Sequence, residues 1–135
     1  MNKVKIYIET TLKKACIKDG QYAAIIEFEK KNGEIATKTI FGVEKETTYH
    51  RSTLLACVET LELLNVPCEV SIHISDFIVS VTGGCKDLKK CPRKEWEAKD
   101  LWKRYTEQLR KHEVTIEQIT DHKYSKYLTE GMRRQ

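Results

Sequence analysis

The sequence has no long apolar run, no internal repeat and no tract of low complexity. A membrane-spanning helix needs roughly 18 or more consecutive apolar residues, so neither a membrane protein of that kind nor a membrane partner is expected. Because no flexible linker divides the chain, we expect a single domain over residues 1–135. A composition of 40% hydrophobic and 33% charged residues is sufficient for both a buried core and a soluble surface.

The chain also lacks a CxxC motif. Its five cysteines are an odd number at irregular spacings: Cys16, Cys57, Cys68, Cys85 and Cys91. This pattern predicts reduced thiols in a cytoplasmic protein. Cys85 and Cys91 are close in sequence, but no second Cys or His pair stands nearby, so a zinc site is not expected. A strand pattern containing Lys3 and Lys5 starts at the N-terminus, and we therefore expect no signal peptide.

Charge is distributed unevenly along the chain. Residues 1–85 carry 10 Lys and Arg against 11 Asp and Glu, a net charge of −1, whereas residues 86–135 carry 14 against 9, a net of +5. The excess begins in a basic segment, residues 86–94, and continues at Lys99, Lys103 and Arg104. A local basic surface attracts phosphate groups through counterion release. A solvated loop and helix face would explain the same residues without any ligand, and both interpretations stay open at this point.

The spacing of apolar residues predicts the secondary structure. Strands are expected over residues 3–11, 22–30, 34–43, 69–74 and 114–119. Helices are expected over residues 49–64, 95–111 and 123–133, with a further short helix that begins at Ser75 or Asp76 and ends at Gly83-Gly84.

Local signals set the boundaries and the topology. Asp19-Gly20 predicts a turn, and Asn32-Gly33 predicts a hairpin that makes the second and third strands antiparallel. Thr48 is expected to cap the first long helix. The resulting order, βββαβα-αβα, predicts an α/β fold with a five-stranded mixed sheet and helices on both faces.

Three motifs, in this order along the chain, resemble the type 1 ribonuclease H family. Thr47-Thr48-x-x-Arg51 followed by Leu54 is similar to that family's T-T-N-N-R-M-E-L segment. Ser75-Asp76-Phe77-Ile78-Val79 is similar to its D-S-Q-Y-V. Asp100-Leu101-Trp102-Lys103-Arg104, followed by His112-Glu113-Val114, is similar to its D-L-W-x-R helix and the next strand. The resemblance covers nearly the whole chain and implies a ribonuclease H-like fold.

The same resemblance implies that most of a metal site is missing. Members of the family cleave the RNA strand of an RNA/DNA hybrid with two Mg²⁺ ions, which prefer several converging carboxylates. The positions of those carboxylates fall at Glu9, Thr53 and Ile74, and near Lys126. Only Glu9 keeps an acid. The resemblance therefore implies a degenerate member, for which we expect neither a bound metal nor another cofactor.

A relocated acidic site is the alternative. Asp76 stands two positions beyond Ile74, and Asp121 ends the last strand beside His122. Together with Glu9, these residues could form a catalytic site that holds Mg²⁺ at the carboxyl edge of the sheet. In the other interpretation, which the sequence favours, Asp76 caps a helix, Asp121 lies in a turn and Glu9 is a solvated strand end.

Other polar and aromatic residues have simpler interpretations. His50, His73 and His112 are expected at the surface or in packing positions, and Trp102 in the core. Trp96 is expected either to pack in the core or to stack on a base beside the basic segment.

The sequence therefore predicts a catalytically degenerate domain that binds nucleic acid, either a duplex or an RNA/DNA hybrid. The expected binding residues are Lys86, Lys89, Lys90, Arg93, Lys94 and Trp96. Two other hypotheses remain, because a fold does not determine a function. One is an active metal-dependent nuclease with the relocated site, and the other is an interaction scaffold for a protein partner.

Overall fold

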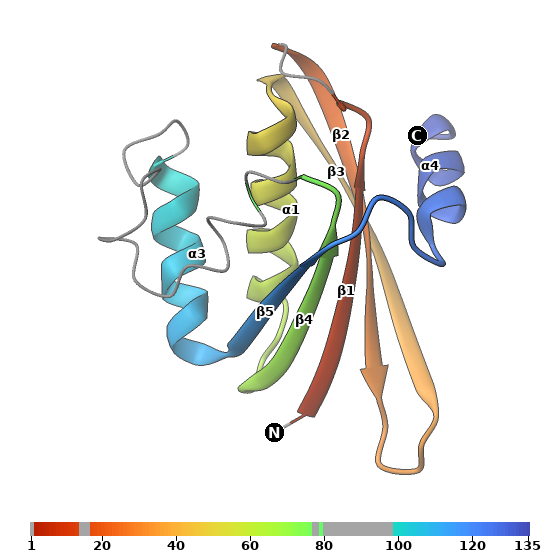
Figure 1. Ribbon diagram of the computed structural model, residues 1–135, viewed down its shortest axis with the longest axis vertical. Helices are drawn as coiled ribbons and strands as arrows, with labels where there is room; N and C mark the ends of the chain where they lie inside the picture. Colours follow the sequence, from red (N-terminus) through yellow and green to blue (C-terminus); the bar gives the residue numbers. More distant parts are fainter. Residues whose placement is uncertain (1, 14–16, 77–78, 80–98) are drawn as a thin grey trace.

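The computed structural model describes residues 2–13, 17–76, 79 and 99–135. The strands in this part of the chain are β1 (Asn2–Thr10), β2 (Lys18–Glu29), β3 (Ile35–Thr47), β4 (Cys68–Ile74) and β5 (Glu113–Gln118). The helices in this part of the chain include α1 (Tyr49–Glu62), α3 (Lys99–Lys111) and α4 (Ser125–Arg133). Figure 1 shows α1 and α3 on one face of the sheet and α4 on the other.

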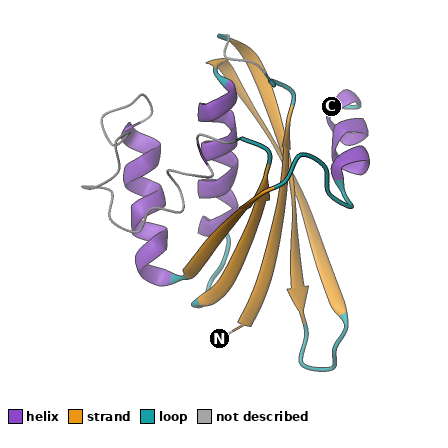
Figure 2. Cartoon of the chain, in the orientation of Figure 1, coloured by secondary structure: helices purple, strands orange, loops and turns teal. Residues whose placement is uncertain are grey.

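The strands form a single five-stranded sheet in the order β3-β2-β1-β4-β5. β1 pairs antiparallel with β2 and parallel with β4, and β4 pairs parallel with β5. The predicted mixed sheet with helices on both faces is therefore confirmed, as the colouring by secondary structure also shows (Figure 2). Since β1 and β4 are parallel neighbours, their carboxyl ends lie side by side at one edge of the sheet.

The predicted hairpin and helix cap are both present. Gly33, with a φ of 86°, lies in the left-handed region within the turn between β2 and β3, a conformation that glycine adopts without steric cost. The Thr48 side chain accepts a hydrogen bond from the Arg51 backbone N–H at 3.1 Å. This contact satisfies one of the free N–H groups at the start of α1.

The turn predicted at Asp19-Gly20 is wrong, because these residues lie inside β2. Gly20 pairs with Glu44 of β3, and the register shifts between Lys18 and Gly20. The Asp19 side chain accepts a hydrogen bond from the Glu46 N–H at 3.0 Å. An Asp-Gly pair can therefore occur at an irregularity within a strand as well as in a turn between strands.

Other boundaries differ by smaller amounts. β3 continues to Thr47, beyond the predicted end at residue 43, because charged side chains are compatible with an edge strand. α1 ends at Glu62 rather than at 64, and α4 begins at Ser125 rather than at 123. The beginning of the predicted helix 95–111 and nearly all of the short helix ending at Gly83-Gly84 lie outside the described residues.

Two apolar clusters hold the layers together. The larger one lies between the sheet and the two helices α1 and α3 and includes the fully buried Ile6, Leu54, Ile72, Leu101 and Tyr105. The smaller one joins α4 to the opposite face through Ala23, Ile25, Leu128 and Met132.

Among the described residues, Cys57 and Cys68 are buried free thiols, and Trp102 is buried as predicted. Cys16, Cys85 and Cys91 lie outside the described residues. None of the described helices has both the length and the apolar character required to cross a membrane.

Candidate functional site

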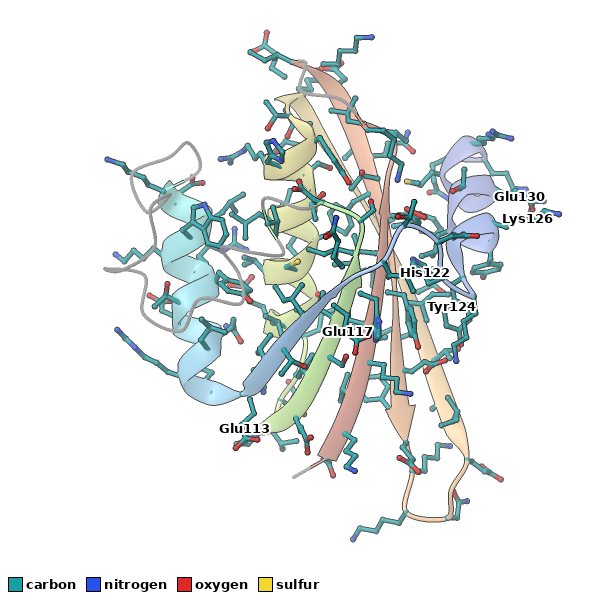
Figure 3. The ribbon with its side chains drawn as sticks, viewed as in Figure 1. Glu113, Glu117, His122, Tyr124, Lys126 and Glu130 are labelled. Atoms are coloured by element: carbon teal, nitrogen blue, oxygen red, sulfur yellow. The ribbon has the colours of Figure 1, made fainter. Side chains whose placement is uncertain are left out.

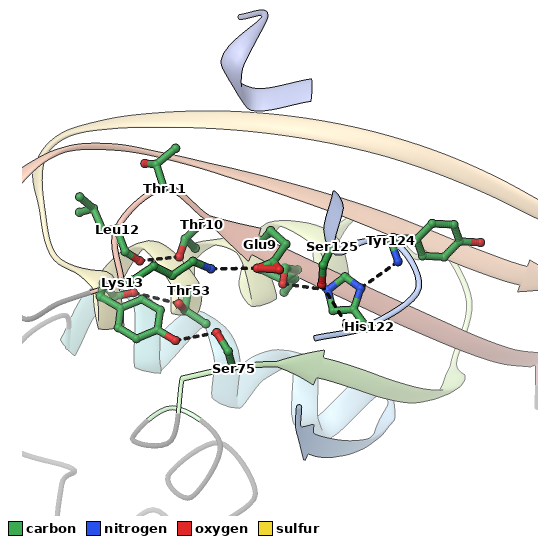
Figure 4. Close-up of polar contacts among 12 residues, drawn as sticks. Glu9, Thr10, Thr11, Leu12, Lys13, Thr53, Ser75, His122, Tyr124 and Ser125 are labelled. Carbon is green, nitrogen blue, oxygen red and sulfur yellow. Dashed lines mark hydrogen bonds and ion pairs between the residues drawn. The ribbon is translucent and has the colours of Figure 1, made fainter. Parts of the chain in front are cut away.

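The carboxyl end of β1 carries Glu9, the acid that the resemblance places first among the metal ligands. Its side chain is only 7% exposed, and its Oε2 atom accepts a hydrogen bond from Lys13 Nζ at 2.9 Å (Figure 4). Lys13 comes from the segment that follows β1 and remains half-exposed. The interpretation of Glu9 as a solvated strand end is therefore wrong: the chain folds its own ammonium group onto this carboxylate.

Thr53 lies on α1, one turn after its first residue, and is buried. Its hydroxyl donates a hydrogen bond to the Tyr49 carbonyl at 2.9 Å, one helical turn earlier (Figure 4). The hydroxyl proton is thus bound within the helix. A neutral oxygen held in this way cannot supply the charge of a metal-bridging carboxylate.

Tyr49 brings a phenol into the same region. Its hydroxyl lies 2.7 Å from Ser75 Oγ at the end of β4 (Figure 4). Burial raises the pKa of Tyr49, and the negative charges of Asp76 and Glu9 raise it further, whereas the bond to Ser75 acts in the opposite direction. Tyr49 therefore lies within the field of both carboxylates and stays neutral at physiological pH.

The end of β4 carries Ile74 and Asp76. Ile74 is 1% exposed and belongs to the larger core cluster, so an apolar side chain fills the place of the implied second-strand ligand. Asp76 is also buried, and its Oδ1 accepts a hydrogen bond from the Val79 N–H at 3.1 Å. This contact confirms the capping interpretation. The other oxygen, Oδ2, lies 2.6 Å from His50 Nδ1.

The segment after β5 carries Asp121 and His122, followed by Lys126 on α4. Asp121 is exposed, and His122 Nδ1 accepts a hydrogen bond from the Tyr124 N–H at 3.2 Å. Figure 3 shows Lys126 and Glu130 on α4. An open depression of about 430 Å³ joins this helix to the end of β1, and it is lined by Glu9, Asp121, Ser125, Lys126, Thr129, Glu130 and Arg133.

These positions do not fit a pair of magnesium ions. Within residues 2–13, 17–76, 79 and 99–135, no three His, Cys, Asp or Glu side chains come together in a way that could hold a metal ion. Glu9 and Asp121 share the depression on α4, but Asp76 is not among its lining residues. Glu9 is bound to Lys13, and Asp76 is bound to His50 and Val79. The proposed trio is therefore not assembled, and Lys126 lines the same depression as Glu9.

The predicted nucleic-acid interface is described only in part. Lys86, Lys89, Lys90, Arg93, Lys94 and Trp96 lie outside the described residues. On α3, Lys99 and Lys103 are exposed, and Arg104 forms a two-pronged ion pair with Glu62 of α1, with Nε 3.2 Å from Oε2. Glu62 raises the pKa of Arg104 and neutralises much of its charge. Arg104 therefore contributes less to a basic surface than its sequence position predicts.

His50, His73 and His112 lie at surface or packing positions, as predicted. His50 is half-exposed and contacts Asp76, whereas His73 and His112 are buried. His112 Nδ1 accepts a hydrogen bond from the Cys68 N–H at 3.0 Å and so ties the end of α3 to the start of β4. His73 stacks on Tyr7, with ring centroids 4.5 Å apart.

A polar cluster on the α4 face of the sheet was not predicted from the sequence. Lys123 Nζ lies 2.7 Å from the buried Glu27 carboxylate and over the rings of Tyr7 and Tyr124. The Tyr124 hydroxyl donates to the same carboxylate. Burial raises the pKa of Glu27, but the bonds from Lys123 and Tyr124 outweigh burial and hold it below its ordinary value. The cluster fastens the β5–α4 connection to β2.

Lys13 and Tyr49 were also missed as parts of the candidate site. The sequence shows a lysine four residues after Glu9, but this spacing has no meaning outside a helix unless the path of the chain is known. Tyr49 reaches Ser75 across 26 positions. Neither contact leaves a periodic or motif-like signal.

Comparisons with known proteins agree with this architecture. No protein-family model matches the chain. The chain is 31% identical over 104 residues to a ribonuclease H of Solibacter usitatus, covering 71% of the chain and 67% of that relative. It is 30% identical over 112 residues to a ribonuclease H of Francisella tularensis subsp. novicida, covering 76% and 69%. A ribonuclease H of Prosthecochloris aestuarii is 29% identical over 116 residues, covering 80% and 76%.

Solved structures show the same fold at lower sequence identity. LC9-RNase H1, a type 1 RNase H with the type 2 active-site motif, superimposes with a TM-score of 0.77 at 14% identity, covering 96% of this chain and 69% of that one. LC11-RNase H1, crystallised in complex with an RNA/DNA hybrid, gives a TM-score of 0.65 at 15% identity and covers 93% of both chains.

Proposed function

The chain belongs to the ribonuclease H family, and from this membership we propose that it is a catalytically degenerate member that binds nucleic acid, an RNA/DNA hybrid or another duplex, without cleaving it. The observation that carries the proposal is the state of Glu9. The one acid retained at the implied metal positions is buried and bound to Lys13 at 2.9 Å.

The other three positions support the loss of catalysis. A divalent ion brings charge that must be offset by oxygen ligands, and Mg²⁺ gives up its water reluctantly. In place of carboxylates the chain presents the bound hydroxyl of Thr53, the buried Ile74 and the cation of Lys126. Metal-assisted cleavage needs an ion that polarises phosphate and activates water, and these side chains provide no binding site for one.

Nucleic-acid binding is supported by the family and by charge. A protein of the same fold, LC11-RNase H1, holds an RNA/DNA hybrid in its crystal structure. In this chain residues 86–135 carry a net charge of +5, concentrated in the basic segment. Exposed Lys99 and Lys103 extend that segment along α3. Phosphate contacts of this kind supply affinity without sequence specificity.

Binding is tested with a labelled RNA/DNA hybrid over a range of salt concentrations, in the presence of EDTA. We expect salt-sensitive affinity that EDTA leaves unchanged, because no metal takes part. The charge reversals Lys89→Glu, Lys90→Glu and Arg93→Glu, made together, should abolish binding or make the slope of log K against log salt concentration shallower. The slope should change by about 3, roughly 1 for each lost phosphate contact.

A matched variant controls for net charge. Lys30, Lys31 and Lys45 are exposed residues of the β2–β3 hairpin and its outer strand, and their reversal to Glu changes the net charge by the same amount. This variant should keep most of the affinity. Full affinity in the Lys89/Lys90/Arg93 variant would contradict the proposed interface and favour a scaffold for a protein partner.

Cleavage is tested separately with the same hybrid in Mg²⁺ and in Mn²⁺. We expect no product above background from the wild-type protein. Glu9→Gln serves as a control for contaminating nuclease, since a contaminant is insensitive to this change. Metal-dependent cleavage that disappears in Glu9→Gln would overturn the degenerate assignment and establish a nuclease with a relocated site.

A further inference from the structure

The outer edge of the sheet has no strand beside it in the part of the chain that the structure describes. β3 is the last strand in the order β3-β2-β1-β4-β5 and is 13 residues long. It pairs with β2 along one side only. Because hydrogen bonds alternate along an antiparallel pair, every second residue of β3 directs its N–H and C=O groups away from β2.

Natural proteins usually protect such an edge with proline, a bulge, a very short strand or charged side chains, and the charged residues within the regular part of β3 are Lys38 and Glu44. β3 contains no proline. Its pairing with β2 runs without a register shift from Glu29↔Ile35 to Gly20↔Glu44, and the irregularity comes only beyond that point. The edge is therefore regular over residues 35–44.

Apolar side chains line this edge on one face. Ile35 is 55% exposed, Phe41 38% and Val43 68%. Their odd-numbered positions put them on the same side of the strand, since side chains alternate between faces. This is the side on which α4 packs, because Phe41 lies against Gly131 of that helix. The edge thus combines unpaired backbone groups with exposed apolar surface.

We propose that β3 pairs antiparallel with β3 of a second copy of this chain, around a two-fold axis at Phe41. A two-fold interface requires a patch that is complementary to itself. With the axis at Phe41, the two Phe41 side chains meet and Thr39 faces Val43 on the same side of the joined sheet. On the other side of the joined sheet, Lys38 of each copy lies opposite Glu44 of the other copy, so the interface contains this charge pair two times.

The charges of these residues favour a second copy as the occupant. Lys38 is exposed. Glu44 is held in place, with Oε2 3.0 Å from Arg51 Nε and Oε1 accepting from the Thr47 hydroxyl. Opposite charges directly across an antiparallel pair stabilise it. An axis at Gly42 would instead place Ile40 opposite Glu44. Shifting the register of the two β3 strands by one residue would move the side chains of one strand to the other face of the joined sheet.

Sedimentation velocity and light scattering over a wide concentration range test the proposal. The wild-type mass should rise from 15.7 kDa to twice that value. Val43→Lys should raise the dimer dissociation constant by roughly tenfold or more, because it places an unpaired charge in the apolar row. Val66→Lys, at a position 49% exposed between α1 and β4, is the matched control and should dimerise like wild type.

A charge exchange tests the register. Lys38→Glu and Glu44→Lys should each weaken self-association, since each places like charges opposite one another. An equal mixture of the two variants should form a heterodimer in which both ion pairs are restored, while circular dichroism confirms that each variant is folded. A wild-type protein that stays at 15.7 kDa, a Val43→Lys variant that dimerises normally, or a mixture without recovery would overturn the proposal. None of these measurements depends on nucleic-acid binding.

Discussion

Glu9, which the resemblance places at a metal-binding position of the ribonuclease H family, has an ammonium group of the same chain as its partner. The exposed part of Lys13 remains in water, while the Glu9 carboxylate is buried. Losing one member of such a pair is costly mainly because the other is left buried without a partner. The ion pair therefore makes Glu9 part of the internal hydrogen bonding of the fold.

Lys13→Met should lower the free energy of unfolding by about 1–3 kcal/mol at neutral pH, because it leaves the buried Glu9 carboxylate without its hydrogen bond. The double variant Lys13→Met/Glu9→Gln should recover part of that loss, since the buried charge is gone. Urea unfolding of the wild type, both single variants and the double variant measures the coupling. Additive effects of the two changes would show that the pair contributes nothing.

Between elements, β2 and β3 come close at one point that requires a glycine. A Cβ atom at Gly42 would lie 2.0 Å from Cε2 of Tyr22. Tyr22 is buried, and its hydroxyl donates a hydrogen bond to Glu59 of α1 at 2.8 Å. Burial raises the pKa of Tyr22, and Glu59 raises it further, so the ring stays neutral and anchored. The ring therefore has little room to move away.

Gly42→Ala should lower the free energy of unfolding by about 1–3 kcal/mol, as overpacking of a buried contact does. The cost should shrink strongly in a Tyr22→Ala background, in which the new methyl group meets no ring. Urea denaturation of the four proteins in this cycle provides the comparison. An equal cost with and without the tyrosine would point to strand geometry rather than to this contact.

Across the whole molecule, two buried histidines link stability to pH. Burial lowers the pKa of His112, and the neighbouring Lys111 lowers it further. Burial also lowers the pKa of His73, although Glu117 opposes this. Because His112 Nδ1 accepts the Cys68 N–H, the ring proton is on Nε2, and a second proton would break that bond.

The free energy of unfolding should therefore decrease as pH falls below 6.5, the ordinary pKa of histidine. Below it the unfolded chain binds protons that the folded chain does not, so the free energy of unfolding declines until the folded-state pKa is passed. His112→Asn keeps a hydrogen-bond acceptor but does not titrate, and it should flatten the curve between about pH 7 and 5. Urea unfolding at a series of pH values measures this, and an unchanged slope would contradict it.

Glu27 adds a separate loss at lower pH. Although burial raises its pKa, the bonds from Lys123 and Tyr124 hold it below the ordinary value of 4.5. A carboxylate of this kind stabilises the fold above its unfolded-state pKa and ceases to do so as pH falls through its folded-state value. The histidine effect is therefore best measured above pH 4.5.

The architecture follows from local patterns in the sequence. Ile6 and Ile72 belong to strand-like patterns, and Leu54 belongs to a helical pattern of apolar residues. These patterns predict that all three side chains are buried, and they lie in one core. Asn32-Gly33 and Thr48 act through their own backbone and their nearest neighbours, so their effects are local and readable. That Thr53 and Ile74 are not acids was likewise evident from residue type, whereas their assignment to metal-binding positions rests on the resemblance. Asp19-Gly20 was misread because only the pairing of Gly20 with Glu44 makes it part of a strand.

The surroundings of each site residue depend on tertiary contacts. Glu9 is buried, and Lys13, from the segment after β1, reaches its carboxylate. Asp76 joins His50, and Tyr49 joins Ser75, across 26 positions of the chain in each case. Whether an acidic side chain is solvated, caps a helix or forms an ion pair depends on which groups the fold brings within about 3 Å of it. Tertiary packing sets that distance, and it leaves no periodic signal in the sequence.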